Sequence, residues 1–325
     1  MFLRVSARRQ RLRKRDKYVT LRVAIVGAGP AGIYAADILL KHEKAPDVSI
    51  DLFERLPAPY GLVRYGVAPD HPRIKGIVDS LREILDSGKI RLFGNVNYGT
   101  DITLQDLKEH YHAVIFATGA MRDAELNIPG IDLPGSFGAA DFVSWYDGHP
   151  DVPRDWPLDA KEVAVIGNGN VALDVARMLV KRPKDLYPTE IPDNVYQALK
   201  SSRVTDVHIF GRRSPRHVKF TPLELRELGE LKDVDIVLHD EDFSRSGVQP
   251  DVTSSSKQLV VIERIFEEWR KRKVGGASRR LHFHFFAQPL QVVGSDAVEG
   301  LRYARTATRP SGQIVTTGEV REQEA

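Results

Sequence analysis

Two glycine-rich turns carry the residue types best suited to chemistry in this chain of 325 residues. The first spans Val26–Gly32 and the second spans Ile166–Ala172. In such turns one glycine permits a tight turn, a second lets a pyrophosphate approach the backbone, and a third small residue lets a helix pack on a strand. Phosphates then lie at the helix N-terminus, where free N–H groups favour anions. A structural, ligand-free turn is the alternative for either one alone.

The residues that follow each turn predict different ligands. A strand over Val48–Phe53 ends at Glu54, which lies 22 residues beyond Gly32. An acid about 20 residues on accepts hydrogen bonds from a ribose diol, as in FAD or NAD. The strand Val207–Phe210 is instead followed by Gly211, Arg212 and Arg213. Because guanidiniums bind phosphate and a carboxylate repels it, this second site favours NADP(H). Two sites of this kind indicate electron transfer between a flavin and a nicotinamide.

The elements that position these turns predict an α/β protein with two Rossmann-like dinucleotide-binding domains. Apolar, β-branched runs indicate strands, and one apolar face predicts a helix over about Arg73–Ser87, with Ile74, Ile77, Leu81 and Leu85 inward. Residues 183–203 form a partly helical insertion, and residues 241–257 form a polar loop. The strands are predicted at Arg22–Val26, Val48–Phe53, Ile90–Phe93, Ala113–Phe116, Glu162–Ile166 and Val207–Phe210, with a later meander of Leu281–Phe286, Leu290–Val293 and Ala297–Thr306.

Composition narrows the class of protein. The chain has no cysteine, which excludes disulfide frameworks, cysteine-ligated iron–sulfur clusters and redox-active cysteine pairs within it. No apolar run reaches the ~20 residues of a membrane span. With 42% hydrophobic residues, the chain can bury two cores. We predict no metal site, no nucleic-acid partner and a cytoplasmic enzyme.

The positive charge is concentrated at the N-terminus. Residues 1–20 contribute +7 to a total of +3, so the remaining chain carries −4. We interpret this segment as a disordered basic extension. A transit peptide, which would place the protein in the mitochondrial matrix, and an RNA- or membrane-binding tail are the alternatives.

Three stretches carry a family resemblance. The loop Tyr60–Pro72, the turn and helix Gly167–Arg177, and the stretch Phe220–Leu228 resemble the adrenodoxin reductase type of ferredoxin–NADP(+) reductase. The resemblance extends from about residue 21 to about residue 320. It implies that NADPH reduces FAD, which passes electrons singly to a ferredoxin or adrenodoxin-like iron–sulfur protein. A flavin suits this task because hydride carries two electrons and a ferredoxin accepts one.

The resemblance also implies roles for individual residues. His71 and Glu227 match a polar pair near the nicotinamide and are the candidate catalytic residues, acting as orienting groups or proton relays. A helix-capping role for His71 stays open, as does a surface role for Asp174. The implied FAD contacts are Gly27, Gly29, Ala31, Gly32, Glu54, Leu62, Val67 and Gly119. The implied NADP(H) contacts are Gly167, Gly169, Asn170, Val171, Arg212, Arg213 and Glu227.

A basic cluster follows in the second domain. Acidic ferredoxins would be steered by such a patch, although a solvated helix is the alternative. The candidate docking residues are Arg264, Arg270, Lys271, Arg272 and Lys273, with Arg279 and Arg280 nearby.

The predicted domain order is an FAD domain with the NADP domain inserted. We assign residues 1–20 to the extension, 21–120 to the first part of the FAD domain, 121–320 to the NADP domain and 321–325 to the start of a return to the FAD domain. Members of the family complete the FAD domain after this return, so we expect that domain to be incomplete here. A truncated NADP-binding module without reductase activity and a flavin monooxygenase or an amidotransferase-linked reductase subunit are the alternative functions.

Overall fold

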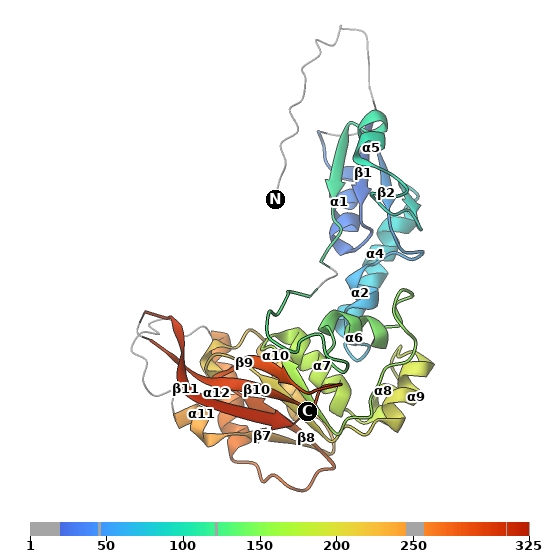
Figure 1. Ribbon diagram of the computed structural model, residues 1–325. Coiled ribbons are helices and arrows are strands. Elements are labelled where there is room, and N and C mark those ends of the chain that lie inside the picture. Colours follow the sequence, from blue (N-terminus) through green and yellow to red (C-terminus); the bar gives the residue numbers. More distant parts are fainter. Residues whose placement is uncertain (1–19, 45–46, 121–122, 245–256, 310, 325) are drawn as a thin grey trace. The chain divides into compact units, whose positions relative to one another are not determined.

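The computed structural model describes residues 20–44, 47–120, 123–244, 257–309 and 311–324 (Figure 1). The predicted basic extension therefore lies outside the described residues except for Thr20. The chain divides into two compact units. Unit 1 comprises the described parts of Met1–Arg64 and Arg73–Ala120, and unit 2 comprises Tyr65–Pro72 with the described parts of Met121–Ala325. The predicted boundary at residue 120 coincides with a unit boundary, whereas the short segment Tyr65–Pro72 packs with the later part of the chain.

Unit 1 contains a parallel sheet with the strand order β3-β2-β1-β4. This is the order of a mononucleotide-binding half of a doubly wound fold. Ile25 and Leu52 are fully buried in its core, as expected for strands covered on both faces. The elements are β1 (Leu21–Val26), α1 (Pro30–Leu40), β2 (Val48–Phe53), α2 (Leu62–Tyr65), α3 (Pro72–Lys75), α4 (Ile77–Asp86), β3 (Ile90–Phe93), α5 (Leu104–His110) and β4 (Ala113–Phe116).

The prediction of one helix over Arg73–Ser87 is wrong in that the helix is divided in two. The chain forms α3 and α4 with a turn at Gly76 between them. Glycine is a poor helix former because it loses more backbone freedom than other residues, so the helix is interrupted there. Leu81 is buried as predicted, but Ile74, which precedes the break, is 45% exposed.

Unit 2 contains a second parallel sheet with the order β5-β6-β8-β7. Its apolar face, with Val207 and Phe283, belongs to the same buried cluster as residues of α7, α10 and α12. The parallel strands are β5 (Glu162–Ile166), β6 (Asp206–Phe210), β7 (Val234–Leu238) and β8 (Arg279–His284). The helices are α6 (Ala139–Tyr146), α7 (Asn170–Val180), α8 (Pro183–Leu186), α9 (Asp193–Ser201), α10 (Pro222–Gly229), α11 (Asp240–Ser244) and α12 (Lys257–Arg270), with a 3-10 turn, η1 (Pro215–His217).

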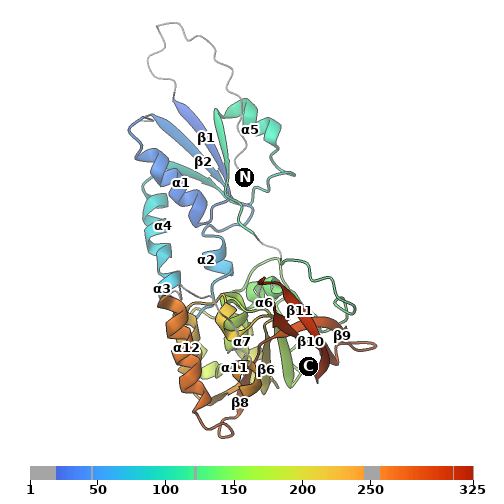
Figure 2. The ribbon, with the colours of Figure 1, turned by 90° about the vertical axis from the view of Figure 1, so that its left-hand side faces the viewer.

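An antiparallel meander of β9 (Ala287–Val293), β10 (Gly300–Thr308) and β11 (Ile314–Glu324) completes unit 2. In Figure 1 and Figure 2 these red strands lie against the sheet that contains β6 and β8. The ring of Tyr303 on β10 packs 5.2 Å from that of Phe210 on β6. The meander therefore covers the face of the parallel sheet opposite to the helices.

Three sequence predictions for unit 2 need correction. The segment predicted as the first meander strand is β8, which pairs in parallel with β6 and β7, because its Leu281 and Phe283 enter the helix-covered core. Residues 321–324, predicted to begin a return to the first domain, extend β11 and pair with β10. The predicted loop 241–257 begins inside α11 and ends in α12, while its residues 245–256 lie outside the described part of the chain.

Candidate functional site

The first glycine-rich turn connects β1 to α1 in unit 1. Gly27 has φ +107°, and a Cβ there would lie 2.3 Å from the carbonyl oxygen of Ala117. A Cβ on Gly32 would lie 2.0 Å from the carbonyl oxygen of Gly27. These two glycines are therefore required by the fold itself. Gly29, the N-cap of α1, makes no side-chain cap, and a Cβ there would come no closer than 3.9 Å to Gly61.

The open N-terminus of α1 is suited to an anion. The first amides of a helix have no partner within the helix, and Gly29 supplies no capping side chain. Ala31, in the first turn, is exposed. The turn thus combines two glycines required by packing with one end that leaves room for a phosphate.

Glu54 lies at the end of β2, where the sequence predicts it. Its Oε2 accepts a hydrogen bond from the N–H of Ala28 at 2.9 Å, and its Oε1 accepts one from the N–H of Leu56 at 3.0 Å. A carboxylate has about four acceptor sites, so each oxygen retains capacity for a hydroxyl. Glu54 therefore fixes the turn and can still accept from a ribose.

The other predicted flavin contacts fall in different units. Leu62 lies in α2 of unit 1 and is 42% exposed. Gly119 has φ +69°, and no heavy atom lies within 4 Å of a Cβ built there, so the chain is open at the end of unit 1. Val67, in contrast, belongs to the segment Tyr65–Pro72 of unit 2.

The second glycine-rich turn connects β5 to α7 in unit 2. Gly167 has φ +151°, and its N–H donates to the carbonyl of Phe210 at 3.1 Å. No heavy atom lies within 4 Å of a Cβ built on Gly169, so packing does not require glycine there. Val171 is 53% exposed. The side-chain oxygen of Asn170 accepts from the N–H of Thr221 at 3.0 Å, which ties this turn to the start of α10.

Arg212 and Arg213 project from a firmly held backbone after β6. The carbonyl of Arg212 accepts from the hydroxyl of Thr306 at 2.9 Å, and the carbonyl of Arg213 accepts from the N–H of Phe286 at 3.1 Å. Both arginines are exposed. Among the described residues, neither guanidinium has a hydrogen-bond or ion-pair partner. Two exposed cations on a fixed loop are suited to a phosphate ligand.

The predicted polar pair His71 and Glu227 lies together in a buried acidic cluster of unit 2. His71 is 6% exposed, and its Nδ1 lies 3.4 Å from Oε2 of Glu227. Its Nε2 lies 2.9 Å from Oδ1 of Asp174 and 3.4 Å from Oε2 of Glu224. Helices α7 and α10 supply the three carboxylates, and the segment Tyr65–Pro72 supplies the imidazole.

Sequence reasoning missed the cation at the centre of this cluster. Arg177 is 2% exposed, and its Nε and Nη2 each donate to a carboxylate oxygen of Asp70 at 2.9 Å. Its Nη1 lies 2.8 Å from Asp174, and Nζ of Lys181 lies 2.7 Å from Asp70. The spacing of residues 174, 177 and 181, three and four apart, places them on one helix face and is the signal that could have revealed the cluster.

The charge balance of the cluster favours a bound proton. Burial and the charge of Arg177 lower the pKa of His71, but its hydrogen bond to Asp174 and the charges of Asp174 and Glu224 outweigh them, so the pKa is raised. Burial also raises the pKa of Glu224. Nε2 of His71 lies 2.6 Å from Nη2 of Arg177 as well as near Asp174, and one nitrogen cannot both accept and donate. The carboxylates around the ring favour the donating form, with the proton directed at Asp174.

Several residues of the predicted basic cluster are engaged within unit 2. Arg270 pairs with Asp240 and with Glu267 at 2.9 Å, and the guanidinium of Arg272 lies 5.8 Å from the ring centroid of Trp269. The side chains of Arg279 and Arg280 bond to backbone carbonyls and to Asp206, respectively. The exposed cations that lack such a partner among the described residues are Arg264, Lys271 and Lys273.

Among the described helices, none has both the length and the apolar character that crossing a bilayer demands.

Comparison with known proteins gives a consistent result. The family model of pyridine nucleotide-disulphide oxidoreductases matches residues 21–208, although this chain has no cysteine to supply a disulfide. NADPH-ferredoxin reductase FprA of Mycobacterium leprae is 41% identical over 289 residues, covering 85% of this chain and 61% of the relative. The mitochondrial NADPH:adrenodoxin oxidoreductase of Arabidopsis thaliana is 41% identical over 290 residues, covering 86% of this chain and 59% of the relative.

The fold agrees with that of a solved relative. Mycobacterium tuberculosis FprA in complex with NADPH matches with a TM-score of 0.88 and 40% identity, over 94% of this chain and 69% of that one. The chain thus spans about three fifths of the length of the two curated relatives. These matches place the chain in the pyridine nucleotide-disulphide oxidoreductase family, among the reductases of the NADPH–ferredoxin and NADPH:adrenodoxin type.

Proposed function

We propose that the chain acts as an NADPH-dependent flavoprotein reductase that passes electrons from NADPH through FAD to a ferredoxin-type iron–sulfur protein. The observation that carries the proposal is the presence of two strand–turn–helix sites with opposite chemistry beyond the turn. Glu54 follows the first site, and two exposed guanidiniums, Arg212 and Arg213, follow the second. The names of the relatives, an NADPH-ferredoxin reductase and an NADPH:adrenodoxin oxidoreductase, support the same function.

FAD fits the site in unit 1. The pyrophosphate would bind the first amides of α1 across Gly29, and Glu54 would hold the adenosine ribose while it stays bonded to Ala28. When bound, the flavin accepts hydride and releases electrons one at a time. The chain itself supplies binding and orientation. We assign residues 21–120 to this cofactor and residues 121–320 to NADP(H), with the segment Tyr65–Pro72 packing in the second unit.

NADPH fits the site in unit 2. Its pyrophosphate would face Gly169 and the first turn of α7, where a Cβ would meet no neighbour. The 2′-phosphate would bind Arg212 and Arg213 by charge-assisted hydrogen bonds. A nucleotide without this phosphate would leave both cations unpaired. The site therefore selects NADPH over NADH.

His71 and Glu227 would orient the nicotinamide end and hold a proton. The three carboxylates near the imidazole favour its charged form, with Asp174 accepting from Nε2. Hydride transfer depends mainly on positioning, so we assign these groups to orientation and proton storage. Arg177 and Asp70 hold the helix and loop that carry them.

An acidic iron–sulfur protein would dock on the exposed cations of unit 2. Arg264, Lys271 and Lys273 are the candidates, because Arg270 and Arg272 are engaged elsewhere. Such docking would weaken as ionic strength rises. We place the enzyme in the cytoplasm, with the mitochondrial matrix as the alternative that the mitochondrial relatives support.

The visible absorption spectrum of the chain tests this function. The purified protein is incubated with FAD, freed of excess, and then treated with NADPH in the absence of oxygen. Retained flavin bands that bleach with NADPH, and cytochrome c reduction that depends on added ferredoxin, support the proposal. A colourless protein that still binds NADPH would refute reductase activity for this chain and favour an NADP-binding module.

A further inference from the structure

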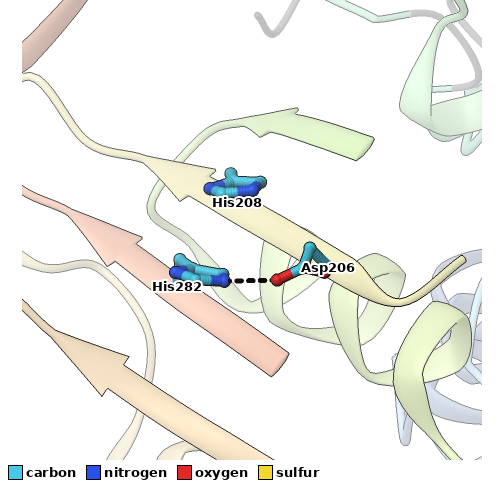
Figure 3. A group of neighbouring side chains, drawn as sticks. All are labelled: Asp206, His208 and His282. Carbon is cyan, nitrogen blue, oxygen red and sulfur yellow. Dashed lines mark hydrogen bonds and ion pairs between the residues drawn. The ribbon is translucent and has the colours of Figure 1, made fainter. Parts of the chain in front are cut away.

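A group of histidines lies on one face of the parallel sheet of unit 2, apart from the nucleotide turn. His208 on β6 is directly paired with His282 on β8, and Asp206 lies two residues before His208 on the same face (Figure 3). His284 follows on β8. The opposite face of these strands is apolar and covered by helices, so the two faces of β6 and β8 differ sharply in polarity.

The donor atoms of this group are close enough to share one ion. The ligand atoms of Asp206, His208 and His282 all lie within 4.8 Å of one another. Oδ1 of Asp206 lies 2.8 Å from Nε2 of His282, and Oε2 of Glu162 on β5 lies 3.2 Å from Nε2 of His208. Two imidazoles and two carboxylates form a donor set that suits zinc and related divalent ions.

We propose that this group binds one divalent transition-metal ion, zinc by the chemistry of its donors. The proposed ligands are Asp206, His208, His282 and Glu162. This differs from the absence of a metal site that the sequence predicts, because these four residues are up to 120 positions apart and only the strand order brings them together.

Asp206 and Glu162 lie at the opposite end of the sheet from the site that we propose for NADP(H). Asp206 and Glu162 are the first residues of β6 and β5, whereas the glycine-rich turn and Arg212 follow the carboxyl ends of these strands. Ligands of doubly wound sheets bind at the carboxyl ends. The proposed ion therefore has a structural task, joining three neighbouring strands, and does not take part in hydride transfer.

Neighbouring groups hold the proposed ligands in place. Nδ1 of His208 lies 2.9 Å from Nε2 of His284. When Nε2 of His208 binds an ion, Nδ1 of His208 carries the proton and can donate a hydrogen bond to Nε2 of His284. Arg280 engages both carboxylate oxygens of Asp206, with Nη2 donating to Oδ2 at 2.7 Å and Nε donating to Oδ1 at 2.5 Å, so the ion must displace Nε of Arg280 from Oδ1 or share that oxygen with it. Nε2 of Gln323 donates to Oε2 of Glu162 at 2.8 Å. Metal-binding histidines and carboxylates commonly have such partners.

Binding requires a local rearrangement. The rings of His208 and His282 stack with centroids 4.2 Å apart and 14° between their planes. Lone pairs of parallel rings do not converge on one point, so the rings must turn, and each Nε2 must pass its proton to Nδ1. The side chains of His208 and Asp206 are buried on the face that the meander covers, whereas His282 is 15% exposed and Arg280 is 51% exposed, so solvent reaches the site past these two residues of β8.

Zinc titration of the full chain, free of any polyhistidine tag and stripped with a chelator, tests the proposal. Isothermal titration calorimetry with ZnCl2 should show one ion per chain and a raised Tm that a chelator reverses. His208→Gln and His282→Gln should abolish both effects, and His284→Gln should weaken binding by about 10- to 100-fold. His71→Gln is the matched control, because His71, Glu224 and Glu227 form another group of residues of the metal-binding types. This variant should leave zinc binding unchanged.

Absence of binding by the unmutated chain, or binding that survives both His208→Gln and His282→Gln, would overturn the proposal. Loss of binding in His71→Gln alone would also overturn it. Binding of 2′,5′-ADP by each variant verifies that unit 2 is folded. A Co²⁺ titration of the unmutated chain needs no substitution: paramagnetically shifted signals from two imidazoles support the site, and the absence of such signals overturns it.

Discussion

The buried ion pair of Arg177 and Asp70 gives the sharpest test of how unit 2 is held together. Both side chains are almost fully buried, at 2% and 3% exposure. Removing one partner of such a pair costs about 3–5 kcal/mol, because it leaves an uncompensated buried charge. In Arg177→Met the side chain keeps its length, and Lys181 still pairs with Asp70. We therefore expect a loss near the lower limit, about 3 kcal/mol.

Urea denaturation followed by tryptophan fluorescence measures this loss. All three tryptophans, Trp145, Trp156 and Trp269, belong to unit 2, so the signal reports on that unit. With a urea m-value of about 2 kcal/mol/M, a loss of about 3 kcal/mol lowers the midpoint by about 1.5 M.

Arg182→Met is the matched control. Arg182 pairs with Asp185 at 2.7 Å, but the side chains are 25% and 30% exposed. Such a pair is worth about 1 kcal/mol or less. Equal midpoints for the two variants, or a loss below about 1 kcal/mol in Arg177→Met, would refute the reasoning from burial.

Further predictions concern the two glycine-rich turns, the segment after β6 that carries Arg212 and Arg213, and the acidic cluster around His71. Gly32→Ala places a Cβ 2.0 Å from a backbone oxygen and should destabilise unit 1 by at least about 1–3 kcal/mol in thermal melts, whereas Gly169→Ala, with an open Cβ position, should retain the Tm and weaken NADPH binding. Thr306→Val removes a hydrogen bond to the carbonyl of Arg212, which is worth about 0.5–1.5 kcal/mol. In competition binding we expect a roughly 2- to 10-fold loss of preference for 2′,5′-ADP over AMP. An unchanged preference would contradict the proposal that Thr306 positions Arg212 for the 2′-phosphate. The pKa of His71 is raised on folding, so its contribution to stability is complete below about pH 6.5 and falls as pH rises through the folded pKa. In urea melts from pH 5 to 9, His71→Gln should lose this part of the pH dependence, and parallel profiles would count against it.

Local features of the sequence predicted the strands and turns well. β2, β3, β4 and β5 have the predicted bounds, because each is a short, largely apolar run that begins directly after a polar residue. Gly76 was the signal for the break between α3 and α4, but a helix can include a single glycine, so the pattern alone did not decide.

Features that depend on tertiary pairing could not be predicted. β8 has an apolar side in the core and a polar side of histidines, and only its pairing with β6 and β7 distinguishes it from a meander strand. The site residues His71 and Glu227 came from a resemblance, and the structure brings them within 3.4 Å. The spacing of residues 174, 177 and 181 indicates a shared helix face, but it does not show that Arg177 is buried against Asp70, 107 positions earlier.

The eight residues Tyr65–Pro72 give the two units an interleaved order along the chain. They belong to unit 2, although unit 1 continues after them at Arg73. A fragment that starts at residue 121 would contain Arg177 and its partner Asp174 but not Asp70 or His71, so the buried guanidinium would lose both hydrogen bonds to Asp70. During synthesis, too, this segment must wait for more than one hundred further residues before its partners exist. Separate expression of unit 2 therefore requires the segment to be supplied, by permutation or as an added peptide.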